Sequence, residues 1–403
     1  MIKKVQAGDV RLGMHIHEIK GNWLEHPFWR KSFLLDQQKD LDKLLSCTLD
    51  EIWIDTSKGL DVAVAVAVSE QTQTTNVVNP DSDKPKTETP RPAKKVSVGE
   101  ELDAAKKIHT KTKEAVTAMF SDVRMGKALE IEEAVSLVDE INQSMERNSN
   151  ALLSLIRLKT VNEYTYLHSV AVCMLMVAVG RQLELSGEQL RQAGVAGLLH
   201  DVGKMAIPSE VLDKPGKLTD DEFTIIKSHP QRGWEILKSC YQVHETALDV
   251  CLHHHERVDG QGYPEKISGD ALTLFARMGA VCDVYDAVSS SRCYKPAWSP
   301  AESIHKMATW AGHFDEKVFH AFVKTIGIYP GSTLIKLKSG RLSVVIEQSQ
   351  KKLTAPIIKI FFSTRANAYI PVEILDLSKG TDSIENIEDP LKWGFDINKI
   401  QGI

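Results

Sequence analysis

The first 68 residues alternate short apolar runs with turn residues. Apolar runs of about four to eight residues are typical of strands, whereas apolar positions at helical spacing are typical of helices. The elements expected here are strands over 10–16, 33–36, 50–55 and 61–68 and a helix over 36–45. The pattern therefore predicts a small α+β module over residues 1–68.

Residues 69–98 differ sharply in composition from the module before them. They contain four prolines and many threonines and lysines, with almost no apolar residues to bury. Such a segment cannot offset the entropy lost on ordering, so we predict a flexible linker here.

Helical periodicity governs the middle of the chain. Apolar positions recur at helical spacing in 102–120 and again in 131–158, and few segments alternate with the period of a strand before residue 328. We expect connecting helices over 99–140 that form a stalk or a bundle wall, followed by a helical domain over 141–328.

Strand-like patterns return at the end of the chain. They lie over 333–340, 341–348, 356–364 and 370–377, with a turn at Lys338-Ser339-Gly340. These segments predict a β-rich extension over 329–403 that packs on the helices. The whole chain is thus expected to be a multidomain, mainly α protein with a small α+β N-terminal module and a short β C-terminal extension.

Composition limits the cellular setting. The apolar content of 42%, the charged content of 26% and the net charge of −5 are ordinary for a soluble protein and argue against broad binding of DNA or membranes by charge alone. The six cysteines form no CxxC pair, and the longest apolar segment, Val170–Val179, is too short to span a bilayer. Without a signal-peptide pattern, we expect a cytoplasmic protein.

Seven of the fourteen histidines lie between His168 and His255. They occur within or at the ends of apolar helical stretches, and a helical bundle could direct them to one centre. A single histidine on an apolar helix is most often a hydrogen-bonded core residue. The pairs His200-Asp201 and His254-His255, with His229 and Asp283, are harder to explain in that way. Imidazole and carboxylate ligands suit Fe, Mn or Zn, and so many ligands favour a dinuclear centre.

The motifs of this region resemble those of the HD-GYP proteins, a subgroup of the HD phosphohydrolases. His200-Asp201 corresponds to the HD signature, and HHERVDGQGYP contains the GYP signature with Gly262, Tyr263 and Pro264. HPQRG and DVYDAVSSSRCYK occur in the same order as in that family. The resemblance spans about residues 150–330. It implies an HD-type helical bundle around two or three metal ions, which hydrolyses cyclic di-GMP to pGpG and in some members onward to GMP.

Residues 1–68 also resemble a small uncharacterised domain found ahead of HD-GYP domains. The likeness rests on RLGMHI, followed by a tryptophan and HPF. It implies no function for the module.

The resemblance assigns roles to individual residues. The implied metal ligands are His168, His200, Asp201, His229, His254, His255 and Asp283. Asp201 would bridge two ions, and a metal-bridging hydroxide would attack phosphorus in line with the departing 3′ oxygen. Asp286, one helical turn after Asp283, would orient that water or pass a proton.

Further residues are expected to bind the substrate. Lys204 could steady a phosphate oxygen and contribute to catalysis, and Arg292 and Lys295 could clamp the phosphates. The family usually has a proline where this chain has Cys293, which leaves both cations in register. Gly262 and Tyr263 would help to select the substrate, and in some family members this loop docks diguanylate cyclase domains.

Two departures refine the expected centre. Family members with three metals carry a glutamate where this chain has Tyr164, so we expect two divalent ions, with Fe or Mn as the expected metals. Three adjacent histidines on a helix cannot face one point, because successive side chains diverge by about 100°, so His253 is not expected to be a ligand. Glu256 could instead hold a ligand histidine in its tautomer.

Other functions stay open at this level. The chain could hydrolyse cyclic GMP-AMP or another nucleotide, or it could be a non-catalytic receptor for cyclic di-GMP; a scaffold with incidental zinc would not need Lys204, Arg292 and Lys295 in register. The metal identity, the end product, the signal sensed by the N-terminal module and the oligomeric state, for which a dimer is one option, also stay open.

Overall fold

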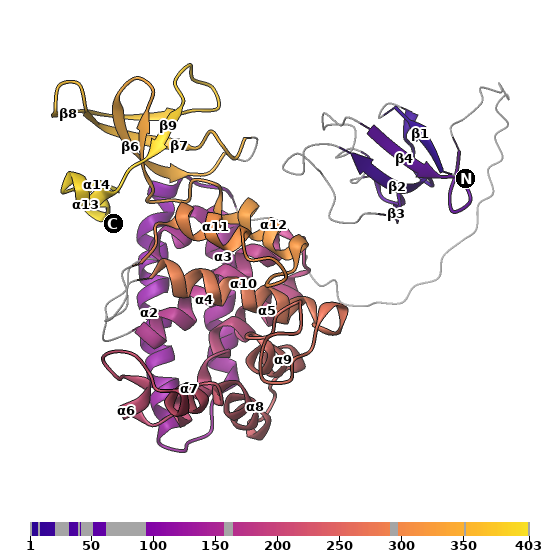
Figure 1. Ribbon diagram of the computed structural model, residues 1–403, viewed down its shortest axis with the longest axis vertical. Helices are drawn as coiled ribbons and strands as arrows, with labels where there is room; N and C mark the ends of the chain where they lie inside the picture. The colour runs from indigo at the N-terminus through magenta and orange to yellow at the C-terminus, as the bar shows by residue number, and fades with distance from the viewer. Residues whose placement is uncertain are drawn as a thin grey trace, which may run out of the picture. The chain divides into compact units, whose positions relative to one another are not determined.

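The computed structural model describes residues 2–6, 9–20, 32–38, 41, 51–61, 94–156, 164–290, 297–349 and 352–401. The chain divides into two compact units, Met1–Thr89 and Pro90–Ile403 (Figure 1). Most of the predicted strand over 61–68, most of the predicted helix over 36–45 and the predicted linker up to residue 93 lie outside the described residues. The finer boundaries expected within the second unit remain predictions.

The first unit contains a four-stranded antiparallel sheet. Its strands are β1 (Ile2–Val5), β2 (His15–Lys20), β3 (Phe33–Leu34) and β4 (Glu51–Asp55), in the order β1-β4-β2-β3. One cluster of buried side chains supports it: Val5, Val10, Met14, Ile16, Leu35, Ile52 and Ile54. A sheet of short strands with one apolar cluster agrees with the strand-containing module that the sequence predicts.

The strand predicted over 10–16 begins later than expected, at His15. Leu12 and Gly13 form a turn, and Gly13 has a φ of +87°, which a residue with a side chain rarely adopts. Strand β1 was not predicted, because its sequence IKKV has little alternation.

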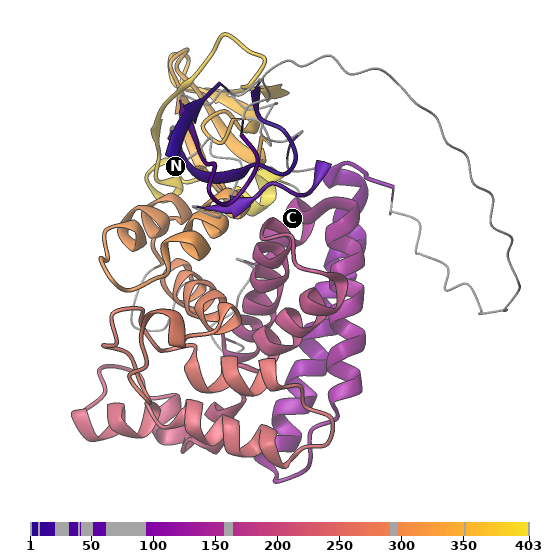
Figure 2. The ribbon, with the colours of Figure 1, turned by 90° about the vertical axis from the view of Figure 1, so that its right-hand side faces the viewer.

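The second unit begins with two long helices, α2 (Val98–Arg124) and α3 (Ile131–Leu155), as the periodicity predicts. A capping box starts α2: the Ser97 hydroxyl accepts a hydrogen bond from the Glu100 amide, and the Glu100 carboxylate accepts one from the Ser97 amide. The two helices pack against each other and against the helices that follow, so they form a wall of the bundle (Figure 2).

A buried ion pair joins α2 to α3. Glu101 is only 3% exposed, and its carboxylate accepts two hydrogen bonds of 2.7 Å from Arg147 and one of 2.7 Å from the Ser144 hydroxyl. Burial by itself would raise the pKa of Glu101, but Arg147 and Ser144 hold it below its ordinary value. The carboxylate is therefore charged inside the helix pair.

We expect Arg147→Ala to lower the free energy of unfolding by about 2–4 kcal/mol, because it leaves the buried Glu101 carboxylate unpaired. Lys111→Ala is the matched control, since Lys111 and Glu140 also join α2 to α3 but are well exposed. The control should change stability by less than about 1 kcal/mol. Urea unfolding of both variants measures the difference, and equal effects would contradict the role given to the buried pair.

The remaining helices build the bundle. They are α4 (Tyr164–Gln182), α5 (Gly187–Leu199), α6 (Ser209–Leu212), α7 (Asp220–Ile226), α8 (His229–Ser239), α9 (Glu245–His253), α10 (Leu274–Ser289), α11 (Pro300–Ala308) and α12 (Glu316–Ile326), with short 3-10 helices η3 (Val202–Ala206) and η4 (Gly269–Ala271). Helix α4 is apolar on all sides and contacts α2, α3, α5, α10 and α12, so it forms the centre of the bundle. Among the described helices, none is long and apolar enough to cross a membrane.

A five-stranded antiparallel sheet follows the bundle. Its strands are β5 (Leu334–Leu337), β6 (Arg341–Glu347), β7 (Ile357–Ser363), β8 (Ala368–Asp376) and β9 (Ile384–Ile387), in the order β8-β7-β6-β5-β9, and the chain continues into α13 (Pro390–Trp393) and α14 (Ile397–Gln401). The predicted turn at Lys338-Ser339-Gly340 joins β5 to β6, with Gly340 at a φ of +81°. Strand β9 was not predicted. Strand β6 contacts α3, as expected of an extension packed on the helices. The predicted fold class is confirmed.

Candidate metal centre and active site

Helix ends bring the candidate ligands to one place in the bundle. His200 and His254 are the C-cap residues that follow α5 and α9, Asp201 is the N-cap residue before η3, and His229 is the first residue of α8. His168 and Asp283 lie within α4 and α10, the two apolar central helices. All of these side chains are buried, and His255 beside them is half-buried.

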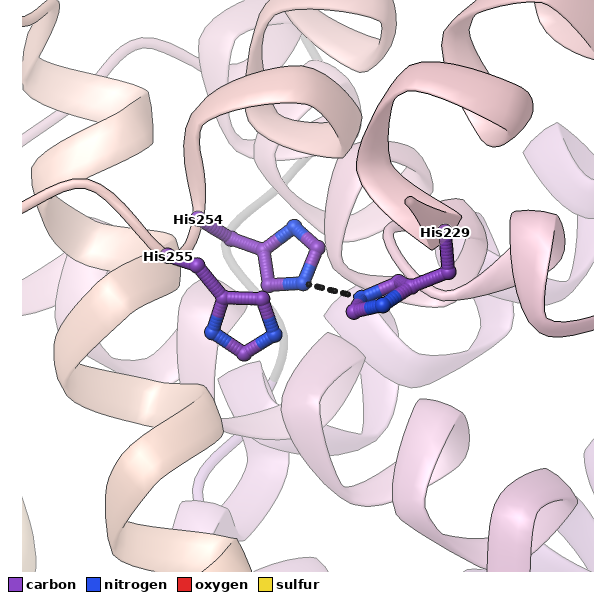
Figure 3. A group of neighbouring side chains, drawn as sticks. All are labelled: His229, His254 and His255. Carbon is purple, nitrogen blue, oxygen red and sulfur yellow. Dashed lines mark hydrogen bonds between the residues drawn. The ribbon is translucent and has the colours of Figure 1, made fainter. Parts of the chain in front are cut away.

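The donor atoms form one continuous cluster. Three sets of three residues each have their donor atoms within 4.8 Å of one another: His168, His200 and Asp283; His200, Asp201 and His254; His229, His254 and His255. His200 and His254 each belong to two sets, so the sets join. Figure 3 shows the rings of His229, His254 and His255 gathered around a common space. The structure thus brings together all seven residues that the sequence suggests as ligands.

The rings are oriented by hydrogen bonds on their outer nitrogens. Nδ1 of three histidines donates to a backbone carbonyl: His200 to Gly197 at 2.8 Å, His229 to Ile226 at 2.7 Å and His254 to Cys251 at 3.0 Å. Because a carbonyl can only accept, Nδ1 carries the hydrogen and Nε2 presents a lone pair. The Nε2 atoms of His229 and His254 lie 3.2 Å apart. Lone pairs converging in this way are the arrangement that a cation stabilises.

Asp201 lies between the two halves of the cluster. Its Oδ1 is 3.2 Å from Nε2 of His229, and its Oδ2 is 3.3 Å from Nε2 of His200. The side chain is fully buried, and Oδ1 has no hydrogen-bond partner among the described residues. A buried carboxylate oxygen beside imidazole lone pairs is costly without a cation. The donor set of imidazole nitrogens and carboxylate oxygens therefore fits a metal centre, with Asp201 able to bridge.

Protonation states favour metal binding. Burial and the neighbouring imidazoles lower the pKa of His254 well below its ordinary value, and burial lowers the pKa of His255 to about 3. Both rings are neutral at pH 7, which is the form that binds metals. Burial alone would raise the pKa of Asp201 and Asp283, but Lys204 beside Asp201 and His168 beside Asp283 hold the pKa of each carboxyl well below its ordinary value. Both carboxylates are therefore ionised.

Asp286 lies on the outer nitrogen of His168. Its Oδ2 is 2.6 Å from Nδ1 of His168, while Nε2 of the same ring is 2.9 Å from Oδ1 of Asp283. Burial alone would lower the pKa of His168, but Asp283 and Asp286 raise it above its ordinary value. The sequence suggests that Asp286 acts on the attacking water. Its contact with His168 instead suits a role in holding that ring in the tautomer that presents Nε2.

We expect Asp286→Asn to weaken metal affinity roughly 10- to 100-fold, because the neutral amide no longer makes the His168 ring as strong a ligand. Competition with a coloured chelator at pH 7.5 measures this. Asp249→Asn is the control, since Asp249 bonds His253 at 2.8 Å, outside the three sets of donor atoms. Unchanged metal affinity in Asp286→Asn would rule out this role.

Lys204 and the GYP loop, residues 257–266, border the cluster. Lys204 lies one turn after Asp201; its Nζ is 2.5 Å from Oδ2 of Asp201, and its side chain is 18% exposed. The Tyr263 ring stacks on the His255 ring, with centroids 4.7 Å apart. His253 contacts Asp249 and Glu265 instead of the cluster, as expected. Arg292 and Lys295 lie outside the described residues.

A backbone contact that sequence analysis missed sets the distance between Asp201 and His229. A Cβ atom on Gly203 would lie 2.0 Å from the His229 carbonyl oxygen and 2.4 Å from the Gly233 amide nitrogen. Only glycine at this position lets η3 and α8 touch. The sequence does contain a sign of this contact, since Gly203 belongs to the LLHDVGK motif and Gly233 to the HPQRG motif.

Two regions of this chain match known protein families, and one known protein is similar to it over nearly the whole length. Residues 2–134 match a domain of unknown function (DUF3391), and residues 137–318 match the family described as HD domain. The cyclic di-GMP phosphodiesterase PA4108 of Pseudomonas aeruginosa is 50% identical over 398 residues, which cover 98% of this chain and 94% of that protein.

Two shorter similarities involve phosphodiesterases that are named for different cyclic dinucleotides. The cyclic di-GMP phosphodiesterase response regulator RpfG of Xanthomonas campestris pv. campestris is 43% identical over 148 residues, 36% of this chain and 39% of that protein. The 3'3'-cGAMP-specific phosphodiesterase 2 of Vibrio cholerae is 39% identical over 125 residues, 30% of this chain and 24% of that protein. The similarity to PA4108 covers both units of the chain.

Proposed function

Because this chain belongs to the HD-GYP family of HD-domain proteins, we propose that it is a metal-dependent phosphodiesterase that hydrolyses cyclic di-GMP. One observation carries the proposal: the buried Asp201 carboxylate separates two groups of imidazole lone pairs. The similarity over nearly the whole length to a cyclic di-GMP phosphodiesterase supports the choice of substrate.

The cluster would hold two divalent ions, with Fe or Mn as the expected metals. His168, His200 and Asp283 would bind one ion, His229, His254 and His255 would bind the other, and Asp201 would bridge them. Bound divalent ions polarise the phosphate and activate water for attack on phosphorus. The neutral rings of His254 and His255 and the ionised carboxylates of Asp201 and Asp283 support this assignment.

The chain's own side chains would position the substrate. The Lys204 ammonium is partly exposed beside Asp201, so it could donate a hydrogen bond to a phosphate oxygen. The Tyr263 ring, stacked on His255, offers an aromatic surface next to the cluster. We keep Arg292 and Lys295 as the proposed phosphate clamp and Gly262 as a further substrate contact. Asp286 would hold the His168 ring during the reaction.

Several finer assignments belong to the same proposal. We propose pGpG as the first product, with further cleavage to GMP open, and a cytoplasmic location. Docking of diguanylate cyclase domains at the GYP loop and the division into segments 1–68, 69–98, 99–140, 141–328 and 329–403 stay predictions.

The rival substrate is cyclic GMP-AMP, because of the similarity to a 3'3'-cGAMP-specific phosphodiesterase. The test is turnover of both cyclic dinucleotides by protein purified without air and loaded with Fe or Mn. We expect faster hydrolysis of cyclic di-GMP, with pGpG as the first product, and loss of activity on chelation. Faster turnover of cyclic GMP-AMP would reassign the substrate, whereas binding without any product would favour a receptor.

A further inference from the structure

We propose that Glu256 is a positioning residue that fixes the GYP loop, residues 257–266, against the metal centre. The loop carries Gly262 and Tyr263, which are expected to contact the substrate, so this inference rests on the proposed function. Glu256 directly follows His255 in the chain, and it is almost fully buried, with 2% exposed. A residue in this position can join the ligand histidines to the loop.

The Glu256 carboxylate binds the far end of the loop. Its Oε1 accepts hydrogen bonds from the backbone amides of Glu265 at 2.7 Å and Lys266 at 2.8 Å. One side-chain oxygen thus satisfies two backbone amides at the end of the loop, which would otherwise need other acceptors. Within the residues that the structure describes, the Glu256 side chain makes no hydrogen bond with a histidine ring. The sequence-based idea that Glu256 holds a histidine tautomer is therefore replaced by a role in the loop.

The middle of the loop folds back onto the same short segment of chain. The Tyr263 amide donates to the His255 carbonyl at 3.2 Å. A Cβ atom on Gly262 would lie 2.4 Å from Cα of Glu256 and 2.5 Å from the Arg257 amide nitrogen, so Gly262 must lie directly on that backbone. Gly262 and the Tyr263 amide are thus held on the N-terminal side of the Tyr263 ring. On its C-terminal side, the Glu256 side chain binds the amides of Glu265 and Lys266. The Tyr263 ring on His255 is thus fixed from both sides.

A buried carboxyl group at Glu256 is costly for a residue that only packs. Its Oε2 is buried without a hydrogen-bond partner among the residues that the structure describes. This side chain lines a small cavity with His253, Arg277 and Asp315, and Arg277 already bonds Asp315 at 2.8 Å. Burying a carboxylate with one oxygen unsatisfied lowers stability. Packing alone would be better served by an apolar side chain, whereas holding two amides requires an acceptor oxygen.

The loop offers a matched control. The Glu265 side chain also anchors the loop, through a 3.2 Å contact with Nε2 of His253, but it is 53% exposed. Exposed pairs of this kind contribute little. Glu265→Ala therefore removes a loop contact without removing the buried acceptor.

The experiment compares Glu256→Ala, Glu256→Gln and Glu265→Ala with the wild-type protein, all loaded with Mn. The readouts are kcat and KM for cyclic di-GMP, hydrolysis of bis(p-nitrophenyl) phosphate, which needs the metal centre but not a shaped substrate loop, and amide exchange over residues 262–266. We expect Glu256→Ala to raise KM at least about tenfold, because two backbone amides of the loop lose their acceptor. The small ester should be hydrolysed at a rate within about threefold of wild type, because its turnover does not depend on these hydrogen bonds.

Rescue distinguishes positioning from a general structural effect. Glu256→Gln keeps an acceptor oxygen, so KM should return to within about threefold of wild type. Glu265→Ala should also leave KM near the wild-type value. Equal impairment of the Ala and Gln variants, or a parallel loss of both activities in Glu256→Ala, would overturn the proposal.

Failure of the proposed function would be visible separately. If wild-type protein does not hydrolyse cyclic di-GMP, the substrate assignment falls, but the amide-exchange readout still tests the anchor. Faster exchange over 262–266 in Glu256→Ala, and not in Glu256→Gln, would support it. Unchanged exchange in Glu256→Ala would overturn it.

Discussion

Replacing Asp201 with asparagine is expected to slow cyclic di-GMP hydrolysis about a thousandfold or more, which corresponds to roughly 4 kcal/mol of transition-state stabilisation. The two carboxylate oxygens face different imidazoles, His229 on one side and His200 on the other. Asparagine keeps one oxygen and places an amide nitrogen on the opposite side. That nitrogen can donate a hydrogen bond to an imidazole lone pair, and the bridging negative charge is lost. Both changes disfavour a pair of cations.

The measurement for Asp201→Asn is kcat for cyclic di-GMP together with metal content by elemental analysis. We expect the content to fall from about two ions per chain to one or fewer. Asp221→Asn, an exposed aspartate in the first turn of α7, is the surface control and should leave both quantities unchanged. If Asp201→Asn retained two ions and a rate within about tenfold of wild type, the bridging role would be wrong.

Gly203→Ala is expected to lower activity by about a hundredfold, since a displacement of about 1 Å at a catalytic site can have that effect. The new Cβ would lie 2.0 Å from the His229 carbonyl oxygen, which is backbone and cannot rotate away. Either η3 or α8 must move, and Asp201 directly precedes η3 while His229 is the first residue of α8. Overpacking of this kind should also lower stability by about 1–3 kcal/mol.

Gly187→Ala provides the matched control for Gly203→Ala. It also lies in a helix of the bundle, but a Cβ there would meet no atom within 4 Å. Its stability and activity should stay near those of wild type. Thermal unfolding and turnover of cyclic di-GMP on both variants give the comparison. Wild-type activity in Gly203→Ala would show that the glycine contact does not set the separation of Asp201 and His229.

Local patterns accounted for much of the fold. The long helices α2 and α3 have apolar positions at helical spacing over many turns, and strands β5 to β8 alternate or form short apolar runs between turn residues. Strands β1 and β9 were missed, because four-residue segments such as IKKV and IENI have too few positions to establish a period. These two strands form by pairing with β4 and β5, partners that are distant in the sequence.

By itself, the sequence was enough to predict which side chains would belong to the candidate centre, because its motifs resemble those of the HD-GYP family in residue type and order. Only the tertiary structure decided what each one contacts. The placement of Asp286 on Nδ1 of His168, the two-sided position of Asp201 and the binding of loop amides by Glu256 all join residues from different elements. Such contacts depend on how helices pack and where backbones touch, as at Gly203. Spacing along the chain carries no record of those distances.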